Sequence, residues 1–120
     1  MHTTLVTAAQ RVLTQLVAHV NAQRPAARGT VSQFQLLGRT QVCASFLQSS
    51  TGQLLDLCVT ITSHGGAMAL AADVVRGGSG ELLSELDPTV ISDEMDLAAA
   101  LRTLERYVWD QGDIIIAAVG

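Results

Sequence analysis

Apolar residues near the N-terminus recur every three or four positions, which is the spacing of an amphipathic helix. The repeat runs from about Thr4 to Gln23. Pro25 then ends it, because the residue before a proline avoids the helical backbone conformation. The positions expected to be buried are Leu5, Ala9, Val12, Leu13, Leu16 and Val20, with Val6 and Val17 widening the same face. We therefore expect an N-terminal helix that packs one face against the rest of the chain.

From Phe34 to Val74 the residue character alternates from one position to the next, which predicts half-buried β-strands. The clearest run alternates Leu55, Leu57, Val59 and Ile61 with Asp56, Cys58, Thr60 and Thr62. A second run alternates Val42, Ala44 and Phe46 with Cys43, Ser45 and Leu47. A third alternates Met68, Leu70, Ala72 and Val74 with Ala67, Ala69, Ala71 and Asp73. The same alternation begins earlier, with Phe34 and Leu36. Together these runs predict four consecutive strands.

Short turn signals separate these strands, so neighbouring strands are expected to pair antiparallel. The expected pairs are Phe46 with Leu57 across a turn at Thr51-Gly52, Ile61 with Leu70 across a turn at Gly65-Gly66, and Leu36 with Val42 across a three-residue loop from Gly38 to Thr40. A one-residue slip would turn a strand's whole apolar set to the other face. This register therefore predicts that helices cover the face that carries Phe46, Leu57, Val59 and Leu70.

A second helix is expected from about Asp93 to Trp109, capped by Ser92 or Asp93 and ended by Gly112. Its buried stripe is Leu97, Leu101, Leu104 and Val108. The segment Glu81 to Leu86 fits either a short strand or a loop. The β-branched, apolar tail from Asp113 to Val119 is a candidate last strand.

These elements predict one α+β domain over residues 1–120. It is a two-layer domain with an N-terminal helix, an antiparallel β-meander of about four to five strands, a C-terminal helix and a possible terminal strand. The length of 120 residues and the 48% hydrophobic content fit one compact core. No stretch of about 18 consecutive apolar residues is present, so no membrane-spanning helix is expected.

Charge narrows the classes of function. The formal net charge is −4 and all seven basic residues are arginine. Residues 1–60 hold four arginines and one acid, Asp56, whereas residues 61–120 hold three arginines and ten acids. Nucleic-acid binding needs clustered cations, so we expect none. The asymmetry suits pairing between halves of one molecule or between two copies, although an acidic surface also serves solubility. Two cysteines are too few for a disulfide scaffold, which favours a reduced, cytoplasmic protein.

The sheet face turned away from the helices is the most informative predicted surface. Its expected side chains are small and neutral, and such a surface can be buried by a partner at little desolvation cost. Arg106 and Trp109 on the second helix are candidate interface anchors. The predicted binding residues are Cys43, Ser45, Leu47, Cys58, Thr60, Ala69, Ala71, Arg106 and Trp109. Alternatively, alanine and threonine simply occupy solvent-facing positions, or the C-terminal segment folds over them.

Candidate catalytic groups are sparse. Asp56 and Asp73 are expected on the same face of neighbouring strands, where they more plausibly border an interface than hold a metal or a shared proton. The expected register sets Cys43 and Cys58 diagonally on that face, too far apart for an easy disulfide. The glycine-rich segment 77–80 lacks the Lys-Ser or Lys-Thr of a phosphate-binding loop. We therefore predict no catalytic residues, no metal site and no cofactor.

The order of helix, antiparallel sheet and late helix in a small acidic chain resembles the small secretion chaperones that bind effector proteins as dimers. It also resembles some toxin immunity proteins. The chaperone layout usually includes a helix within the sheet region, and none is expected between Val31 and Val75. The prediction is a non-enzymatic protein-binding module, dimeric or bound to another protein. One alternative is a small-ligand-binding protein or small enzyme with a pocket between helices and sheet, whose polar groups would come from His19, Arg39, Arg76 or the Asp56–Asp73 pair. The other is a structural subunit of a phage or secretion assembly.

Overall fold

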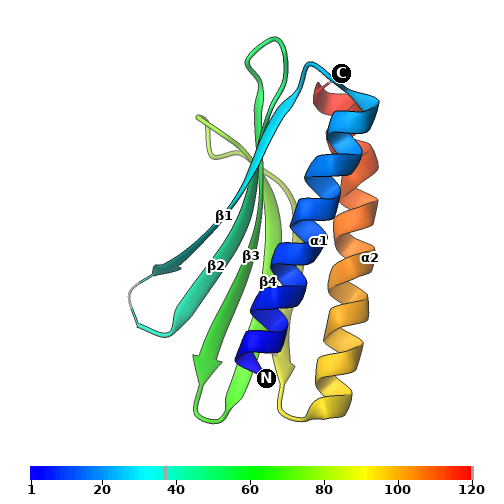
Figure 1. The fold of residues 1–120 in the computed structure, drawn as a ribbon. Coiled ribbons are helices and arrows are strands. Elements are labelled where there is room, and N and C mark those ends of the chain that lie inside the picture. Colours follow the sequence, from blue (N-terminus) through cyan, green and yellow to red (C-terminus); the bar gives the residue numbers. More distant parts are fainter. Residues whose placement is uncertain (37, 120) are drawn as a thin grey trace.

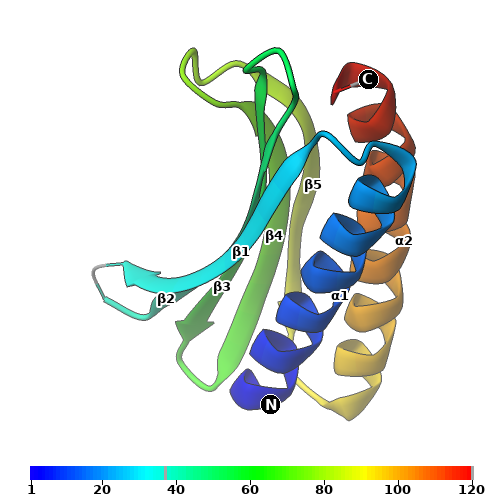
Figure 2. The same ribbon diagram turned by 45° about the horizontal axis from the view of Figure 1, so that its top comes forward.

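The computed structural model describes residues 1–36 and 38–119, and it confirms the two-layer α+β fold (Figure 1). The elements are α1 (His2–Gln23), β1 (Arg28–Leu36), β2 (Thr40–Gln48), β3 (Leu54–His64), β4 (Ala67–Arg76), β5 (Leu82–Ile91) and α2 (Glu94–Val119). The five strands form one antiparallel sheet in chain order. Both helices lie side by side on the same face of that sheet (Figures 1 and 2).

Helix α1 follows the predicted pattern closely. It ends at Gln23, two residues before Pro25, and all six positions of the predicted stripe are buried. Val6 is buried with them, and Val17 packs against the core. Apolar periodicity is sufficient here because this helix has one buried face and one solvated face.

The strand registers agree with prediction at one hairpin and differ at two. Between β3 and β4, Ile61 pairs with Leu70 and Leu57 with Val74, as expected. Between β2 and β3, Phe46 pairs with Asp56, so the predicted pairing with Leu57 is wrong by one residue. Between β1 and β2 the predicted loop is also wrong: Leu36 pairs with Thr40, and Phe34 with Val42.

The one-residue slip has a local cause in the β2–β3 connection. The connecting loop is five residues long, from Ser49 to Gln53, instead of a two-residue turn. The Ser49 N–H donates to the Gln53 carbonyl at 2.8 Å, and the Ser49 hydroxyl accepts from the N–H groups of Gln53 and Thr51 at 2.9 and 3.3 Å. A serine hydroxyl that binds nearby backbone amides stabilises a loop of this kind. The closed loop pairs Gln48 with Leu54 and shifts the whole of β2.

The slip reverses the two faces of β2. Cys43, Ser45 and Leu47 point toward the helices and are fully buried, so their predicted position on the uncovered face is wrong. The Cys43 thiol lies 4.0 Å from the Val6 carbonyl of α1. Val42, Ala44 and Phe46 take the opposite face instead. Cys43 and Cys58 therefore lie on opposite faces of the sheet, and the predicted diagonal arrangement is wrong.

The C-terminal part also differs from the prediction. Residues 82–91 form a full strand, β5, with two register shifts against β4. Helix α2 is capped by Asp93, whose carboxylate accepts from the Asp96 N–H at 2.8 Å. The helix continues through Gly112 to Val119, so no terminal strand forms. A side chain at Gly112 would approach Leu16 to 3.2 Å, and the glycine thus allows α1 and α2 to pack closely while Ile115 extends the buried stripe.

The core lies between the helices and the inner face of the sheet. Leu57, Val59 and Ile61 of β3 are fully buried there. Tyr107 of α2 is buried, as predicted, and its hydroxyl lies 3.1 Å from the Ser84 hydroxyl of β5. Figure 2 shows that the strands bow toward the helices, so the opposite face of the sheet is concave. Neither α1 nor α2, the helices of residues 1–36 and 38–119, covers that concave face.

Candidate functional site

We call the concave side the outer face, and the strand registers define its side chains as rows across the sheet. One row runs Leu36, Thr40, Thr62, Ala69 and Val90; the next runs Phe34, Val42, Thr60 and Ala71; the third runs Ser32, Ala44, Cys58, Asp73 and Glu85; and the fourth runs Thr30, Phe46, Asp56, Val75 and Leu82. The first two rows carry no charged residue. The third and fourth rows carry three carboxylates.

The uncharged end of the outer face exposes large apolar side chains. Val90 is 64% exposed, Leu36 51% and Phe34 41%. A hollow of about 320 Å³ at this end is lined by Thr62, His64, Ala67, Met68, Ala69 and Val90. Leu36 and Phe34 lie at the β1 edge and Val90 at the β5 edge, with half-buried Thr40, Thr62 and Ala69 between them. Leu82 (52% exposed) and Phe46 (36%) add exposed apolar surface in the row that holds Asp56. Exposed apolar side chains gathered on one face are typical of an interaction site.

Two apolar residues in the middle of the outer face are buried although no helix lies over them. Val42 is 5% exposed and Ala44 is not exposed at all. They lie in a concave surface between larger or longer neighbours, Phe34, Phe46 and Thr60 among them. These two positions are therefore shielded from water by their neighbours on the sheet.

Three carboxylates gather at the other end of the outer face, on β3, β4 and β5. Asp73 pairs with Cys58 on one side and with Glu85 on the other, and Asp56 lies two residues from Cys58. Burial raises the pKa of Asp56. Burial and the neighbouring Glu85 charge raise the pKa of Asp73. Both shifts mean that the charged forms lack the hydration and the counter-charge that would stabilise them.

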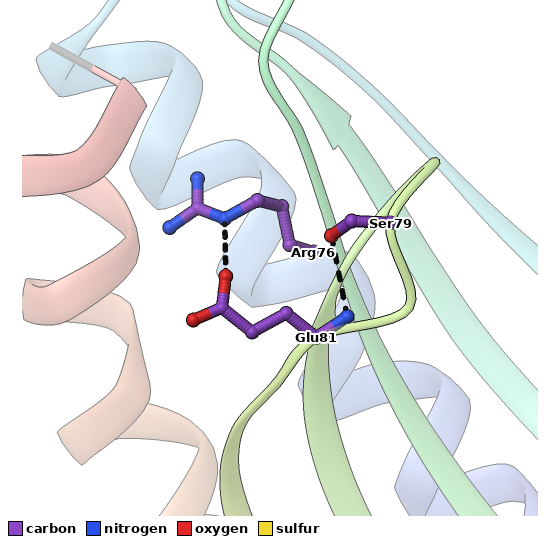
Figure 3. A network of polar contacts seen from close by, with 3 residues as sticks. All are labelled: Arg76, Ser79 and Glu81. Atoms are coloured by element: carbon purple, nitrogen blue, oxygen red, sulfur yellow. Dashed lines mark hydrogen bonds and ion pairs between the residues drawn. The ribbon is translucent and has the colours of Figure 1, made fainter.

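These carboxylates have no ion-pair partner within residues 1–36 and 38–119. The ion pair found there joins Arg76 to Glu81 in the β4–β5 connection, with 3.2 Å between Nε and Oε2 (Figure 3). In the same loop the Ser79 hydroxyl accepts from the Glu81 N–H at 3.3 Å. Arg76 is thus engaged away from Asp56 and Asp73. The carboxylates of the outer face are therefore not ion-paired among the residues that this structure describes, although Arg28 of β1 lies on the same face, one row beyond Thr30 and Phe46.

The predicted binding residues fall into three separate places. Cys58, Thr60, Ala69 and Ala71 lie half-buried on the outer face, as predicted. The three β2 residues lie inside the core, as described above. Arg106 is exposed on α2, and Trp109 packs edge-on against His19 of α1 with ring centroids 5.3 Å apart. Arg106 and Trp109 therefore belong to the helix layer, on the other side of the sheet from the outer face.

Prediction from the sequence missed the residues that make the outer face apolar. The alternation places Phe34, Phe46 and Val42 in the core because they are apolar, although aromatic residues are also enriched at interfaces. Val90 and Glu85 lie in β5, which the pattern left undecided. The available signal for β2 was its composition, since both of its alternating sets are apolar or small and either could face inward.

The side chains of the outer face are poorly suited to covalent or metal chemistry. Burial, reinforced by the charges of Asp73 and Asp56, raises the pKa of the Cys58 thiol to about 11, so the nucleophilic thiolate is scarce near neutral pH. In the described part of the chain, no three His, Cys, Asp or Glu side chains are grouped as a metal ion would need. Neither helix in these residues is long and apolar enough to cross a membrane.

Comparison with known proteins adds no relative. No family model, no curated protein and no solved structure matches this chain. The class that the fold and the outer face define is an α+β domain with one uncovered, concave sheet face.

Proposed function

We propose that this protein is a non-enzymatic protein-binding module and that the outer face is its binding surface. The observation that carries the proposal is the set of large apolar side chains that this face exposes around already buried positions. Exposing Phe34, Leu36 and Val90 to water is unfavourable by about 25 cal/mol per Å² of apolar surface. A partner that covers them recovers that free energy, and no segment of the described chain does so.

The shape and charge of the outer face indicate what kind of segment would bind. Two concave faces leave a void when stacked, so a second copy packs poorly face to face, whereas a convex segment such as an α-helix fits. Asp56, Asp73 and Glu85 favour a partner that brings arginine or lysine side chains to that end. The proposed partner segment is therefore an amphipathic helix whose apolar face contacts the exposed apolar side chains and whose cations lie at the end that meets these carboxylates.

The alternative functions have less support. The polar groups that a small-molecule pocket would need are dispersed: His19 contacts Trp109, Arg76 pairs with Glu81, and Arg39 lies in the β1–β2 turn. A binding pocket requires such groups to converge. The surface groove of about 550 Å³ at the β2–β3 loop is lined by Ala26, Arg28, Gln48, Ser49, Ser50, Thr51 and Gly52. It holds one charged residue and no obvious acid–base pair.

A charge-reversed pair of peptides tests the proposal. Two synthetic 18-residue amphipathic helices share the same leucine face and differ only in carrying lysine or glutamate beside that face in their last two turns. We expect the lysine peptide to bind at least about tenfold more tightly, a difference of about 1.4 kcal/mol. Fluorescence anisotropy at several salt concentrations measures the affinity. The Asp73→Asn/Glu85→Gln double variant should lose most of that preference.

Ala69→Arg tests whether the uncharged end of the outer face contributes to peptide binding. The arginine would fill the hollow beside Val90 and add a cation, while its length lets the charged head reach water, so the fold should remain intact. Thr103→Arg, on the exposed face of α2, adds the same charge elsewhere and is the control. Binding that is equal in both variants, or absent for both peptides in the wild type, contradicts the proposed binding surface.

A further inference from the structure

The two edges of the sheet differ in how well they are protected from pairing with another strand. Edge strand β5 carries Glu85, Asp87 and Pro88 and has two register shifts against β4. Charges, proline and bulges are the features by which natural proteins block edge pairing. Edge strand β1 has nine residues, a continuous register with β2, no proline and one charged residue, Arg28. From Ser32 to Leu36 every side chain is exposed.

The helix beside each edge shows the same difference. Over its 22 residues α1 carries one charged side chain, Arg11. A cavity of about 340 Å³ between α1 and β1 is lined by His2, Thr3, Val6, Thr7, Gln10 and Gln33. This flank of α1, which borders the β1 edge, is therefore made of neutral polar side chains. Helix α2 on the far side carries charges of both signs along its exposed face, from Glu94 to Asp113.

We infer that β1 pairs antiparallel with β1 of a second copy of this chain, giving a closed dimer with one continuous ten-stranded sheet. The inference rests on the free edge of β1 and does not depend on the proposed function, although Phe34 and Leu36 belong to both surfaces. The occupant is a second copy because the edge is self-complementary. Antiparallel pairing places the two Arg28 side chains at opposite ends, so no like charges meet.

Full pairing of the nine residues fixes the register around Ser32. On the outer face Phe34 then lies opposite the partner's Thr30, and Leu36 opposite the partner's Arg28. An aromatic side chain beside a β-branched one is a favourable cross-strand pair, and the arginine stem covers apolar surface. The outer faces of the two copies become continuous. The protected β5 edge cannot add a further chain, so the dimer is closed and does not extend into a filament.

The first test is the mass in solution, measured by light scattering during size-exclusion chromatography at tens of micromolar protein. The wild type should have twice the monomer mass of 12.6 kDa. Ser32→Lys sets two lysines opposite each other across the two-fold axis and should return the mass to that of the monomer. Leu83→Lys on the β5 edge is the matched control and should remain dimeric. A wild type that is monomeric, or that forms rings or filaments, overturns the inference.

The second test reads the register. A two-fold antiparallel pair brings a residue opposite its own copy only at the centre. In a Cys58→Ala background, Ser32→Cys should cross-link into dimers with a short bifunctional thiol reagent, whereas Thr30→Cys, which faces Phe34 of the partner, should cross-link at least about tenfold more slowly. Equal cross-linking at both positions contradicts the proposed pairing. Because neither variant replaces Asp56, Asp73 or Glu85, peptide binding can succeed or fail independently.

Discussion

The inner face of the sheet is apolar and covered by α1 and α2, whereas the outer face mixes apolar, polar and acidic side chains and is covered by neither helix. On β3 the faces are easy to distinguish, because Leu57 and Val59 alternate with Cys58 and Thr60. On β2 they are not, since Val42, Ala44 and Phe46 are as apolar as Cys43, Ser45 and Leu47. The difference shows that a strand with one polar set has a single possible orientation, whereas a strand with two apolar sets depends on its neighbours and its loop. The second apolar set of β2, Val42, Ala44 and Phe46, lies on the outer face and adds apolar side chains there.

The largest effect should separate neighbouring residues of β3. Leu57 is fully buried beneath the helices, and Leu57→Ala should lower the free energy of unfolding by about 2–5 kcal/mol through lost burial and the cavity left behind. Cys58→Ala, one residue later on the outer face, should cost less than about 1 kcal/mol. Urea unfolding followed by circular dichroism measures both. Similar losses in the two variants would mean that something covers the outer face too.

A smaller effect of opposite sign is expected in β2. The Ser45 hydroxyl is buried against the helices and has no hydrogen-bond partner among the described residues. An unsatisfied buried hydroxyl is destabilising, so Ser45→Ala should raise the free energy of unfolding by about 1 kcal/mol. The same urea titration measures the gain. Ser32→Ala, at an exposed position of β1, is the control and should change stability little; a loss of stability in Ser45→Ala would indicate an unseen partner for the hydroxyl.

The smallest effect concerns the acidic end of the outer face. The folded-state pKa of Asp73 lies above its ordinary value near 3.8, so the folded protein holds this proton more tightly than the unfolded chain. The resulting stabilisation is complete below the unfolded pKa and is lost as pH rises through the raised folded pKa. Asp73→Asn should therefore increase stability at neutral pH and weaken the gain that the wild type shows on acidification to about pH 4.

Asp110→Asn on the exposed face of α2 is the matched control for that titration. It removes the same charge outside the outer face. If the Asp110 and Asp73 variants changed the pH dependence equally, net charge alone would explain the effect. Binding of the lysine peptide should remove part of the pH dependence in the wild type, because a cation beside Asp73 favours the ionised carboxylate.

The sequence predicts where the helices and strands of this fold lie better than it predicts which face of each strand points inward. The α1 stripe, the β3 and β4 faces and the Asp93 cap all follow from local patterns. The orientation of β2 does not follow from such a pattern, because the Ser49–Gln53 loop determines it. The backbone amides of this loop donate to the Ser49 hydroxyl, and the alternation along the strand gives no sign of these hydrogen bonds. The predicted helix end at Gly112 is also wrong. Glycine often follows the end of a helix, but here it lies inside α2 and allows close packing against Leu16.

The residues of the candidate site could be predicted only on strands whose inward and outward faces could be predicted. Thr60, Ala69, Ala71 and Cys58 come from β3 and β4 and lie on the outer face as expected. The large residues that give this face its apolar character come from β1, β2 and β5, where turn geometry and register shifts decide which side chains point outward. The sequence predicts a small, neutral surface, and the structure instead presents a concave face that exposes large apolar side chains and carries three carboxylates toward one end.

Phe46→Arg and Leu47→Arg, compared by urea unfolding under the same conditions, test most directly the assignment of inner and outer faces. Leu47→Arg places a charge in the core and should cost about 4 kcal/mol or more, or prevent folding altogether. Phe46→Arg keeps its charge at the solvated edge of the outer face and should cost about 1 kcal/mol or less. The reverse result, with Phe46→Arg unfolded and Leu47→Arg stable, would mean that Phe46 faces the helices, as a two-residue turn predicts. It would contradict the assignment of the outer face and with it the proposed binding surface.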